Sequence, residues 1–572
     1  MTDDGMHPIE TSSNRGRWVI GLGAAGAAIA LAAGALVLFG APVSPDALRY
    51  IPADAMAVAE LRMDLPGDQL QHVGNLLAHF PGFADQATLP AKIDAALGRL
   101  VTSAGDLSVD YTTDIKPWLS GPAFVGAFAP VPGATVGAER PRLVISATTN
   151  GAVTCAATLR DQALTHEIYR GLDVALSADG MTACVIDGRQ ALLGDPATVK
   201  RALDAKADGT GMDKSANYRA ARAALGGDRL ATVYLDATAL TKLMPTPGAS
   251  FAIPGIAGLE GLVGSAPAWT IVGVRAEDDA LVVDTVTAPT STAAVGATAG
   301  TTQLPLPPTH ASVLAGMVPA DTLLLVEDQG SGVSLQNLLA RLGASPQVGA
   351  QLKMLDGLGG AGALVGWIED AGVAVSARGT TERMPDVALL LVAADEAAAS
   401  SRVASLGAIL GLAGLGDGVT IARSTINGVA VTTLSITDLG SLLPPGVVPG
   451  LDTLPTPGPI SISVAAKGRV VVVTSGEAAM TAILNVAAGS SLADQAAFRQ
   501  AGRHALANSR TSIYVAAGAS IDLVKGMLPA EAAAKFATDV APYVDPIEAF
   551  AISVTRDEAT RRSRLVITVS QP

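Results

Sequence analysis

Two aspartates in the stretch "DYTTDIKPW", residues 110–118, come nearest to catalytic chemistry by residue type and spacing. Asp110 and Asp114 lie four positions apart, and a carboxylate pair can divide the acid and base roles of a hydrolase when the local environments separate the two pKa values. Aspartates in a turn also cap backbone amides, and this structural interpretation competes with the catalytic one. We therefore assign no catalytic residue.

The six histidines offer little for a metal site. His72 and His79 are seven positions apart, so one helix can show both on a single face, with Asp68 and Asp85 nearby in the sequence. A metal site needs several convergent ligands, and we expect surface histidines here instead. We expect no bound metal and no cofactor.

Glycine-rich motifs do not indicate a nucleotide. "GLGAAG" at 21–26 matches the dinucleotide fingerprint, but it follows a polar tail rather than a strand, and the positions after it stay apolar up to Pro42. "GLGGAG" at 357–362 is typical of a flexible turn. The sequence holds no phosphate-binding loop, no G-x-S-x-G, no S-x-x-K and no H-E-x-x-H. Nucleotides are therefore not expected partners.

Composition and charge narrow the class of protein. The 572 residues suggest two to four domains, and 49% are hydrophobic whereas only 16% are charged. A net charge of −14 argues against a nucleic-acid partner, because phosphate binding requires a basic face. The two cysteines, Cys155 and Cys184, are too few for a disulfide framework or a cysteine-cluster zinc site. An oxidising compartment would allow them to pair, and the sequence leaves that pairing open.

The N-terminal region predicts a membrane anchor. Residues 18–40 carry no charge, and roughly 20 helical residues cross a bilayer core. We predict a transmembrane helix at 18–40 and a cytoplasmic tail at 1–17, because Arg15 and Arg17 precede the span and only Arg49 follows closely. The rival interpretation is a cleaved signal peptide, whose apolar region is usually shorter and ends in a cleavage site. The expected location is the cell membrane, single-pass, with the bulk of the chain extracytoplasmic.

Long segments of the chain repeat each other. "YIPADAMAVAEL" from residue 50 is matched by "MVPADTLLLVED" from residue 317. The last third of each repeat is clearer: "DGRQALLGDPATVKRAL" parallels "KGRVVVVTSGEAAMTAIL", "YRAARAAL" parallels "FRQAGRHAL", and "ATVYLDATAL" parallels "TSIYVAAGAS". These elements keep a constant offset of 280 residues, as Tyr234 and Tyr514 illustrate. The pattern predicts an internal duplication.

The predicted fold is α+β, with the transmembrane helix followed by two duplicated α+β modules that contain mixed or antiparallel sheets. The modules span 48–287 and 311–572, and a linker rich in Thr, Ala, Gly and Pro joins them at 288–310. Within the first module, Asp195 and Pro196 are suited to the N-cap and first turn of a helix.

Two apolar segments are interrupted by proline and glycine, at 243–267 and 439–459. Such segments form neither long strands nor straight helices. They are either loops packed on the modules or exposed flaps that contact a lipid, a partner or the membrane surface. The sequence leaves both interpretations open.

The chain resembles a known protein family after the apolar span. "YIPADAMAVAELRMDLPGDQ", "HFPGFADQ" and "DYTTDIKPWLSG" are similar to a family of bacterial membrane-anchored proteins, catalogued as a domain of unknown function, number thirty-three fifty-two. The likeness extends from about residue 48 to the C-terminus and is clearest over 50–125. The resemblance implies a membrane-anchored location and carries no activity, cofactor or catalytic residue.

These observations favour a non-enzymatic binding or scaffolding protein of the cell envelope. Its expected partners are the membrane, through the N-terminal helix, and a lipid or an envelope protein. The alternatives are an extracytoplasmic hydrolase that uses Asp110 and Asp114, and an anchored module on the cytoplasmic side.

Overall fold

A computed structural model describes residues 45–62, 68–81, 83, 91, 94, 111–129, 142–159, 164–239, 267–288, 304–343, 362, 365–377, 385–413, 419–436, 460–556 and 560–570. Within these residues no helix is long and apolar enough to span a membrane. The predicted span at 18–40, residues 243–266 of the first apolar segment, the whole of the second, and residues 289–303 of the linker lie outside the described residues.

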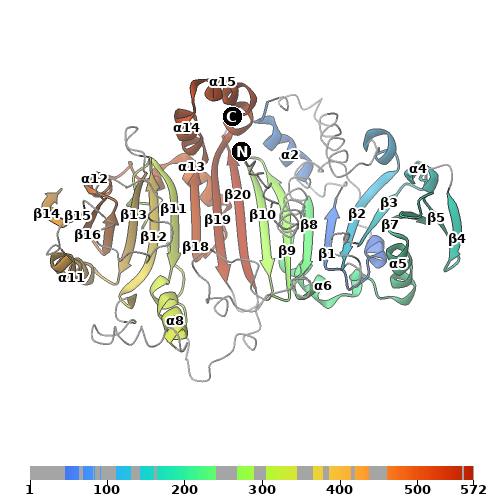
Figure 1. Ribbon diagram of the computed structural model, residues 1–572, viewed down its shortest axis with the longest axis horizontal. Helices are drawn as coiled ribbons and strands as arrows, with labels where there is room; N and C mark the ends of the chain where they lie inside the picture. The colour runs from blue at the N-terminus through green and yellow to red at the C-terminus, as the bar shows by residue number, and fades with distance from the viewer. Residues whose placement is uncertain are drawn as a thin grey trace, which may run out of the picture.

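The described residues of the first half of the chain, within 45–288, contribute ten strands to a continuous antiparallel sheet. Its strand order is β4-β5-β6-β7-β3-β2-β1-β8-β9-β10 (Figure 1). The strands are β1 (Ala57–Leu61), β2 (Leu119–Phe128), β3 (Arg142–Thr149), β4 (Thr165–Tyr169), β5 (Leu172–Leu176), β6 (Ala183–Asp187), β7 (Gln190–Gly194), β8 (Ala231–Asp236), β9 (Trp269–Glu277) and β10 (Ala280–Thr287).

The second half, residues 304–570, pairs its strands in a matching order. That order is β14-β15-β16-β17-β13-β12-β11-β18-β19-β20. The strands are β11 (Thr322–Gln329), β12 (Ile368–Ser376), β13 (Asp386–Ala393), β14 (Val419–Ile426), β15 (Val429–Ile436), β16 (Ile460–Lys467), β17 (Val470–Thr474), β18 (Thr511–Ala516), β19 (Ile547–Arg556) and β20 (Arg561–Val569).

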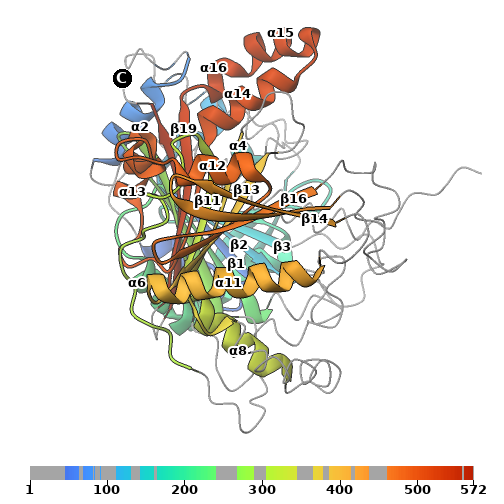
Figure 2. The same ribbon diagram turned by 90° about the vertical axis from the view of Figure 1, so that its left-hand side faces the viewer.

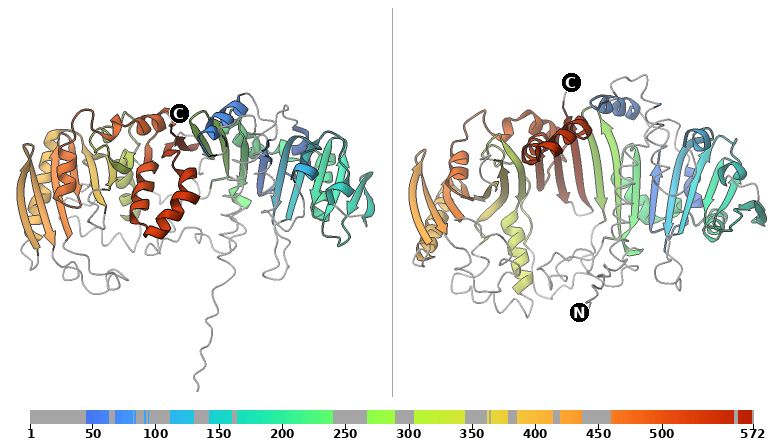
Figure 3. Two further views of the ribbon diagram at one scale, coloured as in Figure 1. Left: turned by 90° about the horizontal axis from the view of Figure 1, so that it is seen from above. Right: turned by 45° about the horizontal axis from the view of Figure 1, so that its top comes forward.

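The two halves join edge to edge because β10 pairs antiparallel with β20. One sheet of 20 described strands results, and from above its strands follow one another in a long curved row (Figure 3). Asp284 lies directly opposite Arg564 at this junction. Arg564 Nε donates to Asp284 Oδ1 at 2.6 Å, and Arg229 Nη2 donates to the other carboxylate oxygen at 3.2 Å. The junction therefore contains a buried carboxylate that accepts hydrogen bonds from two arginines.

Helices cover both faces of the sheet. In the first half they are η1 (Pro45–Tyr50), α2 (Gln69–Ala78), η3 (Tyr111–Ile115), α4 (Cys155–Leu159), α5 (Pro196–Asp208), η4 (Met212–Lys214) and α6 (Ala216–Leu225). In the second half they are α8 (Ser331–Gly343), α11 (Glu396–Ala413), α12 (Glu477–Leu484), η9 (Leu492–Asp494), α13 (Ala496–His504), α14 (Ala517–Met527), α15 (Ala530–Asp539) and α16 (Ala541–Val544). Figures 1 and 2 place α14 and α15 beyond the ends of the central strands.

Each half has its own apolar core on the same kind of scaffold. In the first half, α5 and α6 pack Val199, Leu203 and Tyr218 against strand residues such as Tyr234. In the second half, α12 and α13 pack Met480 and Phe498 against Tyr514 and its neighbours. An edge-to-face aromatic pair recurs at the same place, with Tyr218 on Tyr234 at 5.3 Å and Phe498 on Tyr514 at 5.0 Å between ring centroids.

The α+β prediction is confirmed, and every strand pairing in the described residues is antiparallel. The start of α5 also agrees with the sequence. Asp195 accepts a hydrogen bond from the Thr198 N–H, and Pro196 occupies the first helical turn.

Candidate functional site

The described structure does not test the candidate carboxylate pair, because it describes only one of the two aspartates. Asp114 lies in η3, a single π-helical turn that precedes β2, and Asp110 lies outside the described residues. The catalytic interpretation of these two aspartates therefore stays a prediction.

His72 takes part in a carboxylate cluster rather than standing alone on the surface. Its Nδ1 lies 2.8 Å from Asp278 Oδ1, and its Nε2 lies 3.0 Å from Asp68 Oδ2. Burial alone would lower the pKa of His72, but hydrogen bonds to Asp278 and Asp68 raise it above the ordinary value. The cluster ties α2 to the β9–β10 turn. Among the described residues, no group of three or more His, Cys, Asp or Glu side chains is placed to hold a metal ion.

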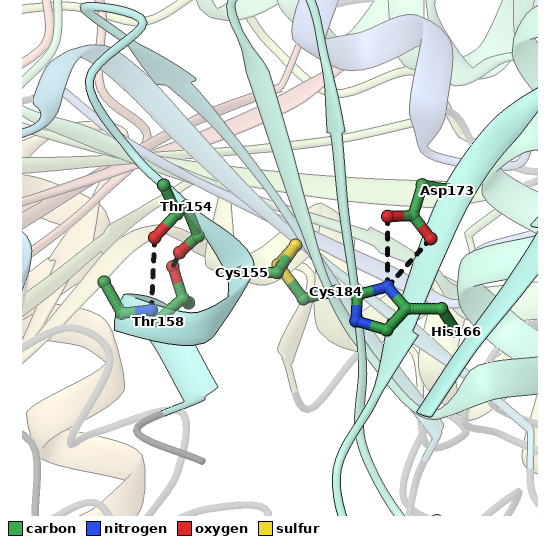
Figure 4. Close-up of a disulfide and its surroundings, with 7 residues drawn as sticks. Thr154, Cys155, Thr158, His166, Asp173 and Cys184 are labelled. Carbon is green, nitrogen blue, oxygen red and sulfur yellow. Dashed lines mark hydrogen bonds and ion pairs between the residues drawn. A yellow bond between two sulfur atoms is a disulfide. The ribbon is translucent and has the colours of Figure 1, made fainter. Parts of the chain in front are cut away.

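A disulfide joins Cys155 of α4 to Cys184 of β6, which answers the question that the sequence left open (Figure 4). The two Cα atoms lie 5.5 Å apart, and the sequence separation of the two cysteines is 29. Nearby, His166 Nδ1 lies 3.0 Å from both carboxylate oxygens of Asp173. The bridge fastens a short helix to the outer strands of the first half.

A cavity of about 460 Å³ lies in the second half, between α13, the strands β11 and β18–β20, and the segment before β11. Its volume falls in the range of small-molecule pockets. Leu325 and Tyr514 are buried at its floor, whereas His310, Gly502 and Asn508 at its rim are exposed. The cavity is therefore open to solvent above a mostly apolar base.

Glu327 is the buried acid of this cavity, and only 8% of the residue is exposed to solvent. Ser512 Oγ donates to its Oε2 at 3.1 Å, and Ser312 Oγ donates to its Oε1. Burial raises the pKa of Glu327, while hydrogen bonds from the two serines and from the Ala315 N–H act in the opposite direction. The carboxylate is thus oriented by neutral donors.

A second carboxylate lies at the edge of the same cavity. Asp370 Oδ2 is 3.1 Å from Nε2 of His310, and its Oδ1 accepts the Gly330 N–H at 3.0 Å. The negative charge of Asp370 adds to the factors that raise the pKa of Glu327. Arg510, which also lines the cavity, donates to the backbone carbonyls of Gln329 and Pro307.

The first half contains a comparable acid with a different partner. Glu60 faces Thr232 across β1 and β8, as Glu327 faces Ser512 across β11 and β18. Thr232 Oγ1 donates to Glu60 Oε2 at 2.9 Å, and Arg222 of α6 lies 3.2 Å from the same oxygen through Nη1. Glu60 is only 3% exposed, so this is a buried ion pair.

Comparison with known proteins places the chain in a family. The model of a family described as "Protein of unknown function (DUF3352)" matches residues 17–569. The chain belongs to the DUF3352 family. No curated protein matches it.

Three solved structures of TP0453 align with parts of this DUF3352 protein. Crystal form III gives a TM-score of 0.21 at 10% identity and covers 43% of this chain and 80% of that chain. Form I gives 0.22 at 10% identity, with 43% and 79% covered, and form IV gives 0.22 at 9% identity, with 42% and 79% covered.

The sequence analysis of the DUF3352 protein did not identify Glu327, the buried acid of the cavity. Glu60 and Glu327 occupy the same place in "AMAVAEL" and "TLLLVED", inside apolar strands where an unpaired acid is costly. The matched positions of these two acids in apolar strands are a sequence signal that could have identified them. A second signal lay in the matched helices "YRAARAAL" and "FRQAGRHAL", where Arg222 stands against Gly502 at the constant offset.

Proposed function

We propose that this DUF3352 protein is a non-enzymatic binding protein of the cell envelope, held in the membrane by residues 18–40 with the described residues outside the cytoplasm. The observation that carries the binding role is the open cavity of about 460 Å³ around the buried Glu327. Its apolar floor and its oriented polar groups are features of a small-molecule site.

The disulfide supports the proposed location. Bridges such as Cys155–Cys184 persist in oxidising compartments and are rare in reducing cytoplasm. The uncharged stretch at 18–40 is long enough to cross a bilayer, and the family match begins at residue 17 and so includes it.

The arrangement of side chains in the cavity supports binding rather than catalysis. Ser312 and Ser512 donate to Glu327, and His310 contacts Asp370. The described contacts therefore orient carboxylates and do not activate a serine through an imidazole base. The alternative hydrolase with Asp110 and Asp114 is not tested by the described residues, because Asp110 lies outside them.

We also propose that the two halves are copies of one module. Matching strand orders, the repeated aromatic pair and the equivalent Glu60 and Glu327 positions support this proposal. A sheet assembled from two such copies would offer two equivalent acid sites, of which one is closed by Arg222.

Topology is tested by cysteine labelling on intact cells. A membrane-impermeant maleimide should label Ala534→Cys, on the exposed surface of α15, without lysis. The matched variant Ser12→Cys, in the predicted cytoplasmic tail, should react only after lysis. The reverse pattern would refute the extracytoplasmic location. The wild-type chain gives the background, because its two cysteines are joined.

Binding is tested separately with the purified full-length chain. A ligand-observed NMR screen of neutral, anionic and cationic fragments should reveal fragments that bind the wild type. These fragments should bind Gly502→Trp more weakly, since a side chain at Gly502 projects into open space beside the cavity. If no fragment binds, or if all bind equally well to the variant, the proposed binding role is wrong.

A further inference from the structure

The two halves of the chain surround their equivalent buried acids, Glu60 and Glu327, with different partners. At the Glu60 site, the carboxylate meets a threonine across the strand pair and an arginine from the covering helix. At the Glu327 site, it meets a serine in the same cross-strand position. The covering helix there has Gly502 in place of Arg222.

Gly502 opens the space that an arginine would fill. A Cβ at this position would meet no described atom within 4 Å. Gly502 and Glu327 line the same cavity. The second half therefore presents a buried carboxylate and, above it, a solvent-open volume on the side from which a guanidinium approaches Glu60 in the first half.

Acidic side chains outnumber cationic ones around this volume, with Glu327, Asp328 and Asp370 against Arg510 among the described lining residues. Glu327 and Asp370 both line it, and the hydrogen-bond partners of Glu327 are hydroxyls and a backbone N–H rather than a charged donor. Arg510 donates guanidinium N–H groups to two backbone carbonyls rather than to a carboxylate of the cavity. The apolar residues Leu325 and Tyr514 at the floor would accommodate a short hydrocarbon stem.

We propose that the Glu327 cavity binds a compact organic cation, a guanidinium or primary ammonium group on a short apolar stem, whose head pairs with Glu327 as Arg222 pairs with Glu60. This inference deepens the proposed binding function and rests on it. A planar guanidinium is the better match, because it donates two parallel hydrogen bonds to a carboxylate.

The test uses propylguanidinium, which reproduces an arginine side chain from Cβ outward, and propylurea as its neutral isostere. Isothermal titration calorimetry on the full-length wild-type chain should give one site with a Kd on the order of 1 mM for the cation, a value typical of a fragment this small. Propylurea should bind at least about tenfold more weakly, since ~1.4 kcal/mol separates tenfold affinities.

Two variants link binding to the proposed contacts. Glu327→Gln should weaken propylguanidinium at least about tenfold by removing the charge, and Gly502→Arg should abolish binding by supplying an internal guanidinium. Gly526→Arg is the matched control, because it adds an arginine to α14, where the space is also open, outside the cavity. It should bind as the wild type does.

Equal binding of propylurea, or undiminished binding to Glu327→Gln, would overturn the cation inference. Absence of any propylguanidinium binding to the wild type would also overturn it. The broader binding function is tested separately by the fragment screen with Gly502→Trp, and the topology measurement tests the location independently of all these outcomes.

Discussion

The Glu60 and Glu327 regions share one backbone plan and differ in how they stabilise a buried carboxylate. In the first, Arg222 neutralises Glu60 and closes the site. In the second, Ser312 and Ser512 orient Glu327, and the space above Gly502 stays open. The difference teaches that a single position in the covering helix can decide whether a buried carboxylate lies in an ion pair or beside an open cavity.

A second pair of matched strand positions also differs between the two halves. Cys184 of β6 pairs with Leu193 of β7, and Val464 of β16 holds the corresponding place opposite Val473. In the first half a disulfide ties Cys184 to the helix after β3. In the second half Val464 belongs to an apolar cluster with Ala399, from the helix after β13. One half uses a covalent link where the other uses packing.

The largest expected effect comes from removing the disulfide. A bridge that closes a loop of 29 residues stabilises by roughly 3–4 kcal/mol in the chain-entropy description. Cys155→Ser/Cys184→Ser should therefore lower the free energy of unfolding by about that amount, measured by urea denaturation. Dithiothreitol should reproduce the loss in the wild type and add nothing in the variant. An unchanged midpoint would contradict a structural role for the bridge.

Arg222→Ala should cost about 3 kcal/mol of stability, because it leaves Glu60 buried without its cation. The estimate stands at the lower end for a buried pair, since the Arg222 side chain is 30% exposed. Thermal and urea unfolding would measure the change.

Two further variants sharpen the Arg222 result. The double variant Arg222→Ala/Glu60→Gln should recover part of the loss, because the uncompensated charge is gone. The matched change in the other half, Gly502→Ala, should stabilise by about 0.5–1 kcal/mol through helix propensity. Equal destabilisation by Arg222→Ala and Gly502→Ala would show that the two sites do not differ as described.

Glu327→Gln should raise stability by on the order of 1 kcal/mol at neutral pH. The folded state raises the pKa of Glu327, so it binds that proton more tightly than the unfolded state does. The contribution of this group is complete below the unfolded pKa and is lost as pH rises through the folded pKa. The variant and the wild type should therefore converge at acid pH and diverge towards neutral pH.

The measurement is the unfolding free energy of both proteins across a pH series. His310, Asp328, Asp370, Arg510 and Tyr514 also line the cavity, and they are present in both proteins. A constant difference across the series would argue against a raised pKa. Propylguanidinium should reduce the gain from Glu327→Gln, since a bound cation stabilises the ionised wild type.

The smallest effect is expected from His72→Gln, in the helix that follows the first strand of the first half. His72 bridges Asp68 and Asp278, whereas α8, after the first strand of the second half, is held by a pair of hydrogen bonds between Asn337 and Leu304. The loss should be about 0.5 kcal/mol, as for other partly exposed pairs.

The pH dependence identifies the cause of the His72 effect. Its pKa is raised above 6.5 in the folded state, so the stability it contributes is present below pH 6.5 and disappears as pH rises through the folded pKa. Unfolding at pH 5.5 and pH 9 should therefore show a larger difference between wild type and variant at the lower pH. A loss of stability that does not change with pH would indicate that the His72 side chain acts through packing.

Local features of the fold were predictable from the sequence because they depend on neighbouring residues. Asp195 and Pro196 mark the start of α5, and the spacing of Val199, Ala202 and Leu203 indicates its buried face. The α+β class followed from patterns of the same kind, and the family followed from the resemblance of stretches such as "DYTTDIKPWLSG". The carboxylate pair at Asp110 and Asp114 stays a prediction, and the buried Glu327 was not predicted as a site residue.

The sequence by itself determined the periodicity of the elements, the helix start at Asp195 and the aligned acids of the two opening strands. Only the tertiary structure decided which distant groups meet: Cys155 with Cys184, Glu60 with Thr232 across 172 residues of chain, and Glu327 with an open cavity. The physical reason is that hydrophobic periodicity reports which face of an element is buried. The partner on that face depends on strand register and helix placement, which no local pattern specifies.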